Sequence, residues 1–477
     1  MPFDHTTEAF IRDFVTDLRE NNVAIFAGAG MSKGSGFVDW PTLLTGVAQE
    51  LGLSVDKEHD LISLAQYHVN HRGNRSGIKR AILEEFSHQA QLSATHRILA
   101  RLPIQTYWTT NYDSLIEDSL KAALKVPDVK SDPKNLSNTR PRRDAIVYKM
   151  HGDVTNSDEA IITKEQYETY YRTHEAFITA LSGDLIAKTF LFIGFSFTDP
   201  NLDYVLSRLR HQSGDRQHYC FMKKESKGAN DDNDTFKYKQ RKQELRVADL
   251  KRYKIAALLI DDYEDIVKIL TEIENRYKKR TIFVSGSAEE YGKWDRLEAQ
   301  KFIHKLSKAI IQAGSTIVNG FGWGVGSAVI NGALEAVYEN YERCSDDQLI
   351  MRPFPQFETG GKSLPDMWQE YREKMISLAG VAIFIFGNKL GNDGAVESAG
   401  GVKKEFEIAQ RQGLVLIPIA ATGYMARELF ELVENNPDDY YQGMGWIVPK
   451  IKELADPSKS PDDLIKLVVE IVKVFNK

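Results

Sequence analysis

An apolar run that leads directly into glycines, close to the N-terminus, constrains the fold of this chain more than any other stretch. Residues 24–27 read Ala-Ile-Phe-Ala and residues 28–32 read Gly-Ala-Gly-Met-Ser. This order is typical of a buried parallel strand that ends in a nucleotide-binding turn. Glycines let the backbone approach a pyrophosphate closely, and the N–H groups that open the next helix attract anions. Because similar turns also close α/β units that bind nothing, the stretch predicts an α/β fold but needs support from elsewhere to predict a site.

Three further apolar segments in this half of the chain also end in small or polar residues. The predicted strands and the residues that follow them are 104–109 with Thr-Asn-Tyr-Asp at 110–113, 145–150 with His-Gly-Asp at 151–153, and 189–193 with Gly-Phe-Ser at 194–196. In an open parallel sheet, ligands bind at the carboxyl ends of the strands, so the four clusters are expected to line one crevice. The irregular residues 34–40, which follow the glycine turn, are predicted to form a lid beside it.

The same alternation of strands and helices starts again after the basic residues 278–280. Strands are predicted at 281–284, 315–319, 381–386 and 414–419, and the second of them runs into the glycine-rich segment 320–327. The predicted fold class is therefore α/β, with two Rossmann-like domains that each have a mostly parallel sheet flanked by helices. We place the domains at residues 1–279 and 280–477.

Charge, cysteine content and hydropathy exclude several classes of function. The 61 basic and 67 acidic residues give a net charge of −6, which offers no reason to expect a nucleic-acid partner. The two cysteines, Cys220 and Cys344, are too few for a four-thiolate zinc site or a disulfide framework, and no metal site is predicted. The sequence shows neither a secretory signal at its start nor an apolar run of membrane-spanning length, so a cytoplasmic protein is expected.

Four motifs of the first predicted domain resemble those of the sirtuin family, in the same order. Residues 28–32 are similar to the sirtuin Gly-Ala-Gly-x-Ser turn, and residues 110–113 to its Thr-Gln-Asn-x-Asp motif. His151-Gly152 is similar to the catalytic His-Gly, and residues 194–196 to the Gly-x-Ser turn that contacts the adenosine ribose. The resemblance covers roughly residues 8–275. Four motifs in the same order, each directly after a predicted strand, are more specific than any one of them alone.

The resemblance implies an enzyme that breaks the nicotinamide–ribose bond of NAD⁺. It makes Asn111 the residue that holds the ribose or the attacking water, and His151 the general base. The sequence itself leaves two structural alternatives open. Asn111 could cap the helix that starts at 114, and Asp199, in the polar cluster after the strand at 189–193, could start a helix instead of lining the crevice. The NAD⁺-binding residues that the resemblance implies are Ala27, Gly28, Ala29, Gly30, Ser32, Asp113, Gly194 and Ser196.

The chain differs from the deacylating sirtuins in three ways. It lacks their two Cys-x-x-Cys pairs, it has Val38-Asp39-Trp40 where they typically have Asp-Phe-Arg, and no peptide-binding strand is evident between His151 and Phe190. Water is therefore expected to be the acceptor, with NAD⁺ as a substrate rather than a cofactor and with no other cofactor. Two alternatives remain: an NAD-dependent protein deacylase or ADP-ribosyltransferase, and a nucleotide-binding signalling scaffold without activity.

The second predicted domain resembles the SLOG family, whose relatives include lysine-decarboxylase-like nucleotide hydrolases. Those hydrolases carry a Pro-Gly-Gly-x-Gly-Thr motif followed by a glutamate, but here the proline and threonine are missing, so nucleotide binding is expected rather than catalysis. Arg372 and Lys389 are the expected cations for a pyrophosphate, although Arg372 could instead lie on the solvated face of a charged helix. The residues predicted to bind a signal nucleotide in this domain are Gly286, Ser287, Gly322, Gly324, Gly326, Arg372, Lys389, Gly401 and Glu405.

A sirtuin-like domain followed by a SLOG domain resembles the effector family of bacterial Thoeris anti-phage defence. This resemblance extends along nearly the whole chain. It implies an NAD⁺ glycohydrolase (NADase) that is switched on when a cyclic ADP-ribose isomer, made by a TIR-domain partner protein, binds the SLOG pocket. It also implies a homo-oligomer, a tetramer or larger. Coupling between two sites is physically reasonable, since unregulated cleavage would exhaust the NAD⁺ of the host cell.

Overall fold

The computed structural model describes residues 3–86, 90–197, 199–209, 216–228 and 232–476. The chain divides into two compact units, Met1–Glu274 and Asn275–Lys477. The predicted domain boundary at residue 279 is the last residue of helix α13 (Glu264–Lys279), whereas the structural division lies within that helix.

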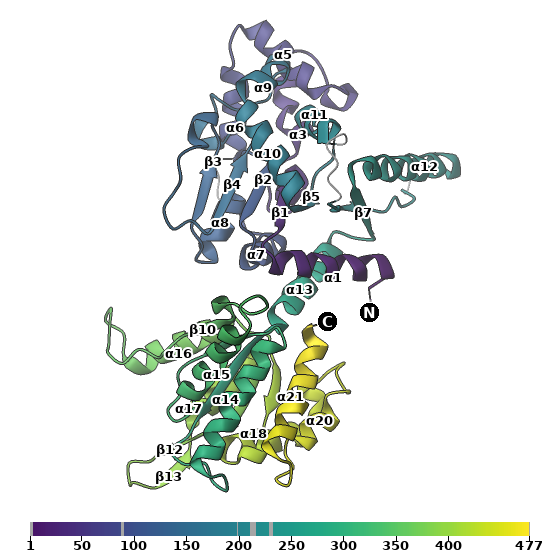
Figure 1. The fold of residues 1–477 in the computed structure, drawn as a ribbon. Coiled ribbons are helices and arrows are strands. Elements are labelled where there is room, and N and C mark those ends of the chain that lie inside the picture. The colour runs from purple at the N-terminus through teal and green to yellow at the C-terminus, as the bar shows by residue number, and fades with distance from the viewer. Residues whose placement is uncertain (1–2, 87–89, 198, 210–215, 229–231, 477) are drawn as a thin grey trace. The chain divides into compact units, whose positions relative to one another are not determined.

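The first unit is built on a seven-stranded sheet in which every neighbouring pair of strands is parallel (Figure 1). In the order of the sheet, the strands are β3 (Pro127–Lys130), β4 (Ala145–Lys149), β2 (Thr106–Thr109), β1 (Val23–Ala27), β5 (Thr189–Ile193), β6 (His218–Lys223) and β7 (Ile255–Ile260). The central strands β1, β2 and β5 are buried at every residue, as expected of strands covered by helices on both faces. The four strand ends predicted to form a site belong to β1, β2, β4 and β5, which are consecutive in the sheet.

Helices connect these strands and cover the sheet. The N-terminal helix α1 is amphipathic and buries Phe10, Phe14 and Leu18 on one face. The helices of this unit before α13 are α1 (His5–Arg19), α2 (Ala29–Lys33), α3 (Trp40–Leu43), α4 (Thr45–Glu50), α5 (Leu61–Arg72), α6 (Ser76–Phe86), α7 (Ala94–Arg101), α8 (Leu115–Ala122), α9 (Lys164–Thr173), α10 (Glu175–Ala187), α11 (Pro200–Leu209) and α12 (Asn233–Leu250).

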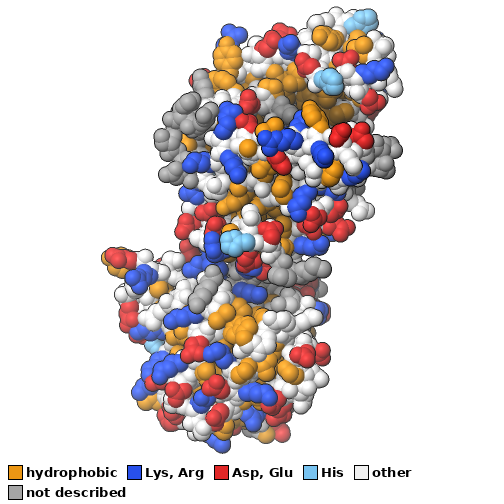
Figure 2. Space-filling model, turned by 90° about the vertical axis from the view of Figure 1, so that its right-hand side faces the viewer, with side chains coloured by type: hydrophobic (Ala, Val, Ile, Leu, Met, Phe, Trp, Pro, Cys, Tyr) orange, Lys and Arg blue, Asp and Glu red, His pale blue; other side chains and the backbone are white. Residues whose placement is uncertain are grey.

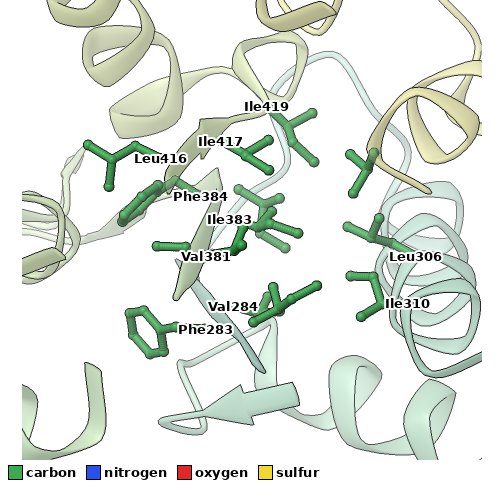
Figure 3. Close-up of a cluster of buried hydrophobic side chains, with 14 of the residues drawn as sticks. Phe283, Val284, Leu306, Ile310, Val381, Ile383, Phe384, Leu416, Ile417 and Ile419 are labelled. Carbon is green, nitrogen blue, oxygen red and sulfur yellow. The ribbon is translucent and has the colours of Figure 1, made fainter. Parts of the chain in front are cut away.

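The second unit has a five-stranded parallel sheet and a separate antiparallel hairpin. Alternate side chains of the sheet point to opposite faces, and Figure 3 shows Val284, Ile383 and Ile417 directed toward Leu306 and Ile310 of helix α14. In the order of the sheet, the strands are β10 (Leu349–Met351), β9 (Thr316–Asn319), β8 (Thr281–Ser287), β11 (Val381–Phe386) and β14 (Val415–Pro418), and the hairpin pairs β12 (Asn388–Leu390) with β13 (Val396–Ser398). The predicted fold class is confirmed.

Helices also flank this second sheet on its two faces. They are α14 (Arg296–Gln312), α15 (Gly326–Glu339), α16 (Leu364–Ile376), α17 (Gly400–Arg411), α18 (Tyr424–Asn435), α19 (Pro437–Tyr440), α20 (Val448–Glu453) and α21 (Pro461–Asn476). Of these, α15 and α17 each begin directly after a glycine-containing segment at the carboxyl edge of the sheet.

The surface of the described residues shows no large region of a single charge on the face in Figure 2, where acidic and basic side chains are interspersed. None of the helices in the part of the chain that the structure describes is long and apolar enough to cross a membrane. Within the same residues, no group of three or more His, Cys, Asp or Glu side chains is arranged to hold a metal ion.

Candidate active site and nucleotide pocket

The glycine turns after β1 and β5 lie against each other, backbone to backbone. The N–H of Gly28 donates to the carbonyl oxygen of Ile193, and the N–H of Gly30 donates to that of Gly194, both at 2.9 Å. A Cβ atom on Gly28 would lie 2.5 Å from the Gly194 oxygen. Gly194 has a φ of +64°, and a Cβ there would collide with the backbone nitrogen of Met31. Glycine is therefore required at these turns by the contact between them.

We expect Gly194→Ala to lower the free energy of unfolding by roughly 2 to 4 kcal/mol, because the added methyl group meets backbone that cannot move aside. Gly183→Ala is the matched control. Gly183 is in α10, and no atom lies within 4 Å of the position that its methyl group would take, so the alanine should raise helix stability by up to about 1 kcal/mol. Urea unfolding of the two full-length variants measures the difference, and equal stabilities would contradict this account of the turn.

Asn111 is held at the end of β2 by a chain of hydrogen bonds. Its side-chain amide donates to the carbonyl oxygen of Gly28 at 3.0 Å and to the hydroxyl of Ser32 at 2.9 Å. The Ser32 hydroxyl in turn donates to Asp113 Oδ2 at 2.7 Å, and Asp113 Oδ1 accepts the N–H of Leu115 at the start of α8. The carboxylate of Asp113, rather than the Asn111 amide, therefore receives the N–H of Leu115. Asn111 is fixed against the glycine turn, as a residue that orients a ligand there would be.

His151 follows β4 and is 1% exposed. Its Nε2 atom lies 3.3 Å from Oδ2 of Asp199 and makes no hydrogen bond within the described residues, while its Nδ1 lies 3.4 Å from the hydroxyl of Tyr167. Burial lowers the pKa of His151, and the nearby Asp199 carboxylate only partly opposes this effect. His151 is therefore neutral at pH 7, the form that a general base requires.

Asp199 has a structural role as well as its contact with His151. Its Oδ1 atom accepts the N–H groups of Asn201 and Leu202, which confirms the prediction that it starts a helix, here α11. Its Oδ2 atom also lies 3.5 Å from the Tyr167 hydroxyl. Sequence reasoning missed Tyr167, because one aromatic residue among several on helix α9 gives no signal that it faces a histidine on another element.

The lid predicted at residues 34–40 is closed over the Asn111 cluster. Lys33 and Asp39 form an ion pair at 2.9 Å, and the N–H of Val38 donates to Glu85 of α6 at 3.0 Å. The cavity that remains has a volume of about 20 Å³, enough for a water molecule but not for a nicotinamide ring. The residues that line it are Ala29, Ser32, Val38, Asp39, Trp40, Leu43, Phe86, Thr110, Asn111, Tyr112 and Asp113. Asn111 is among them and His151 is not, so this cavity does not join the two predicted catalytic residues.

The remaining predicted NAD⁺ contacts lie around the same turns. The carbonyl oxygen of Ala27 accepts the Thr109 hydroxyl at 2.9 Å, which ties β1 to β2 at their carboxyl ends. Ser196 is exposed, and its carbonyl oxygen accepts a hydrogen bond from Arg246 of α12. The structure thus places Ala27 at the end of β1, the other predicted NAD⁺-binding residues on the segments that follow β1, β2 and β5, and His151 on the segment that follows β4.

Two other buried histidines make the first unit sensitive to acid. Burial lowers the pKa of both His96 and His218 to about 4, and Nδ1 of His218 accepts the N–H of Phe190, which a protonated nitrogen could not do. Between pH 6.5 and about 4 the unfolded chain binds more protons than the folded one, so stability falls as the pH falls. His218→Gln should remove about 3 kcal/mol of the loss between pH 7 and pH 4. The free energies of unfolding of wild type and variant are measured in urea across this pH range. If both fall by the same amount, the assignment is wrong.

In the second unit, glycines allow the segment after β9 to lie on the end of β8. A Cβ atom on Gly322 would collide with the carbonyl oxygen of Gly286, and one on Gly324 with that of Ala288. Gly326 lies against Phe321, where a Cβ would be 2.7 Å from the Phe321 Cα. These predicted signal-binding glycines thus belong to one closely packed turn at the carboxyl edge of the sheet.

Glu405 and Arg372 meet beneath this edge. Glu405 Oε2 accepts the Ser285 hydroxyl at 2.6 Å, and Glu405 Oε1 lies 3.4 Å from Nε of Arg372. Burial raises the pKa of Glu405, while Ser285 and Arg372 partly offset the shift. The Arg372 side chain is only 13% exposed and lies over the ring of Phe354, at 5.0 Å from its centre. The alternative that Arg372 lies on a solvated helix face is therefore wrong.

The other predicted signal-binding residues are divided between this cluster and the hairpin. Gly401 lies against Arg372, because a Cβ there would be 3.2 Å from its Nη2 atom. Ser287 donates to the carbonyl oxygen of Asn388 at 2.9 Å. Lys389, in contrast, is 56% exposed on β12 and pairs with Glu397 of β13 at 2.9 Å. In this structure, Lys389 is thus paired within the hairpin rather than with the Arg372 and Glu405 cluster.

Comparisons with known proteins assign both units to families. A family described as "Sir2- and TIR-associating SLOG" matches residues 265–475, and one described as "SIR2-like domain" matches residues 105–247. These matches confirm the predicted pairing of a sirtuin-like domain with a SLOG domain.

The curated relatives match from end to end. NAD(+) hydrolase ThsA of Bacillus cereus (strain MSX-D12) is 48% identical over 480 residues and covers 100% of both chains. Proteins of the same name are 48% identical in Cytobacillus dafuensis, over 98% of this chain and 96% of the relative, and 43% identical in Acinetobacter baumannii (strain 532279), over 99% of each chain. The chain therefore belongs to the ThsA family of NAD(+) hydrolases, in agreement with the Thoeris effector family that its motifs predict.

Proposed function

We propose that the chain hydrolyses NAD⁺ to nicotinamide and ADP-ribose at the Asn111 and His151 site, and that a cyclic ADP-ribose isomer bound in the second unit activates it. The observation that carries the first part is the position of His151, a buried imidazole directly after the end of β4, whose neighbouring strand β2 presents Asn111 at the same edge of the sheet. The names of the ThsA relatives support the same reaction.

The proposed reaction needs little acid catalysis, because nicotinamide leaves as a neutral molecule. The bond between the ribose C1′ atom and the nicotinamide nitrogen breaks, and its electron pair stays on the nitrogen. Asn111, fixed by Gly28 and Ser32, orients the ribose or the water. The water oxygen bonds to C1′, and its proton passes to His151 and then to solvent. No metal or further cofactor enters this scheme.

The closed lid supports regulation of this site. A cavity of about 20 Å³ beside Asn111 is too small for NAD⁺, so the lid, residues 34–40, has to move before the substrate binds. Arg372 offers a guanidinium for a pyrophosphate of the signal, and its contact with Glu405 is the interaction that such an anion would compete with. A TIR-domain partner that makes the signal, and assembly into a tetramer or larger oligomer, complete the proposal.

Incubation of the purified full-length chain with NAD⁺ and a panel of cyclic ADP-ribose isomers, without any acceptor protein, tests the reaction. Hydrolysis predicts many turnovers of nicotinamide release per chain, with ADP-ribose in equal amount. Release that depends on an added acylated or acceptor protein would instead identify a deacylase or ADP-ribosyltransferase. If no condition consumes NAD⁺ while nucleotides still bind, the chain is a signalling scaffold.

A further inference from the structure

A buried lysine joins the two loops that carry Asn111 and His151. Lys149, the last residue of β4, is 0% exposed. Its Nζ donates to the carbonyl oxygens of Tyr112 at 3.1 Å and Asp113 at 2.5 Å, in the loop directly after Asn111. The same ammonium forms an ion pair with Asp153 Oδ2, in the loop directly after His151. One cation therefore contacts both loops where the sheet ladder has ended.

The position of this ammonium has a physical reason. β2 and β4 are parallel neighbours, and their ladder ends at Thr109 and Lys149. Beyond that point the buried carbonyl oxygens of the next residues need other donors, and an ammonium supplies three N–H groups from one atom. A hydrogen bond from the Val154 N–H to the Tyr112 oxygen, at 3.0 Å, is a second link between the loops.

The charge of Lys149 is balanced within the cluster. Burial by itself lowers the pKa of Lys149, but the carboxylates of Glu117 and Asp153 outweigh it, and the net shift is upward. Burial raises the pKa of Glu117, which lies 3.1 Å from Nζ on helix α8 and is only partly compensated by Lys149. Lys149 lowers the pKa of Asp153 despite burial. Both carboxylates therefore pair with the cation, and Glu117 is the weaker acid of the two.

We propose that Lys149 is a positioning residue for NAD⁺ cleavage, which sets the separation of Asn111 and His151 by holding the carbonyl oxygens of Tyr112 and Asp113 and the carboxylate of Asp153. This inference rests on the proposed function of the site. Lys149 does not touch the substrate. It acts because a displacement of about 1 Å between reacting groups can cost on the order of 100-fold in rate.

Two variants in the same buried cluster separate positioning from stability. Asp153→Asn replaces the Oδ2 acceptor by an N–H₂ group that faces the ammonium, and so removes the link between Lys149 and the His151 loop, while its Oδ1 still caps residue 155. Glu117→Gln is the matched control, because it alters the contact with α8 but leaves both loops joined to Lys149. Lys149→Met removes all the donors at once.

The experiment measures kcat, KM and the thermal midpoint of the full-length variants with NAD⁺ and a panel of cyclic ADP-ribose isomers. We expect kcat to fall at least about 10-fold in Asp153→Asn and about 100-fold in Lys149→Met, with KM little changed. Glu117→Gln should stay within about threefold of wild type, even if its thermal midpoint falls. If Lys149→Met does not fold, the comparison of Asp153→Asn with Glu117→Gln decides alone.

Equal kcat values for Asp153→Asn and Glu117→Gln, whatever their thermal midpoints, would overturn the positioning role and leave a purely structural one. Wild-type chain is assayed in parallel. Absence of nicotinamide release by wild type would refute the proposed function itself, and is thereby distinguished from failure of this inference.

Discussion

Replacement of His151 by alanine should reduce the release of nicotinamide from NAD⁺ by about 10²- to 10⁴-fold, the usual contribution of a general base. The buried imidazole is neutral, and alanine has no group that can take the proton of the attacking water. The effect is measured as the steady-state rate of nicotinamide release, quantified by chromatography at saturating NAD⁺ with the signal present.

His218→Gln is the control for this experiment. His218 is also a buried neutral histidine, but it is the first residue of β6 and lies at the opposite end of the sheet from the carboxyl edge. The variant should keep wild-type kcat at neutral pH. If His151→Ala and wild type consume NAD⁺ at equal rates, the catalytic assignment is wrong and the scaffold alternative gains support.

Replacement of Arg372 by alanine should raise the concentration of cyclic ADP-ribose isomer needed for half-maximal activation by roughly 10- to 100-fold, the value of one hydrogen bond to a charged group. The side chain lies next to Glu405 and Gly401 at the start of α17, where its guanidinium is the expected partner of a pyrophosphate. Lys389→Ala should act in the same direction but less strongly, because Lys389 is exposed and paired with Glu397.

Arg411→Ala controls for the loss of an arginine in the second unit. Arg411, at the end of α17, is exposed and pairs with Glu373 on the surface, so its removal should leave activation unchanged. Any basal NAD⁺ cleavage should persist in all three variants. Loss of basal activity together with signal response in Arg372→Ala would contradict the division between a catalytic and a sensing unit.

The parts of the fold that could be predicted are those in which the sequence pattern and the packing agree. β1 and β11 are apolar throughout, β2 and β5 are rich in aromatic and β-branched residues, and all four are followed by glycine or polar residues, so their positions can be predicted from the sequence. β3 was missed because Pro-Asp-Val-Lys is not the pattern of a strand. Its Asp128 and Lys130 are both buried, and the ion pair between them, at 3.0 Å, offsets part of the free-energy cost of removing two charges from water.

The candidate sites, like the fold, could be predicted only in part from the sequence. Motifs locate Asn111 and His151, which follow strands, and Glu405, which lies in the helix that Gly400 and Gly401 open. Arg372 is predicted as a cation within a charged helix. Motifs do not reveal which side chains lie over these residues, because contacts such as that of Tyr167 with His151 join elements that are unrelated in sequence. Lys149 is another case, since a lysine that ends a strand normally faces solvent, and only the packed loops show that it is buried.

The most direct test of the account is the rate of nicotinamide release by the full-length chain from NAD⁺ alone, measured with and without each cyclic ADP-ribose isomer. The account predicts slow release without signal, because the lid leaves only about 20 Å³ beside Asn111, and a marked increase with at least one isomer. Rapid release that no isomer alters would contradict signal-gated hydrolysis.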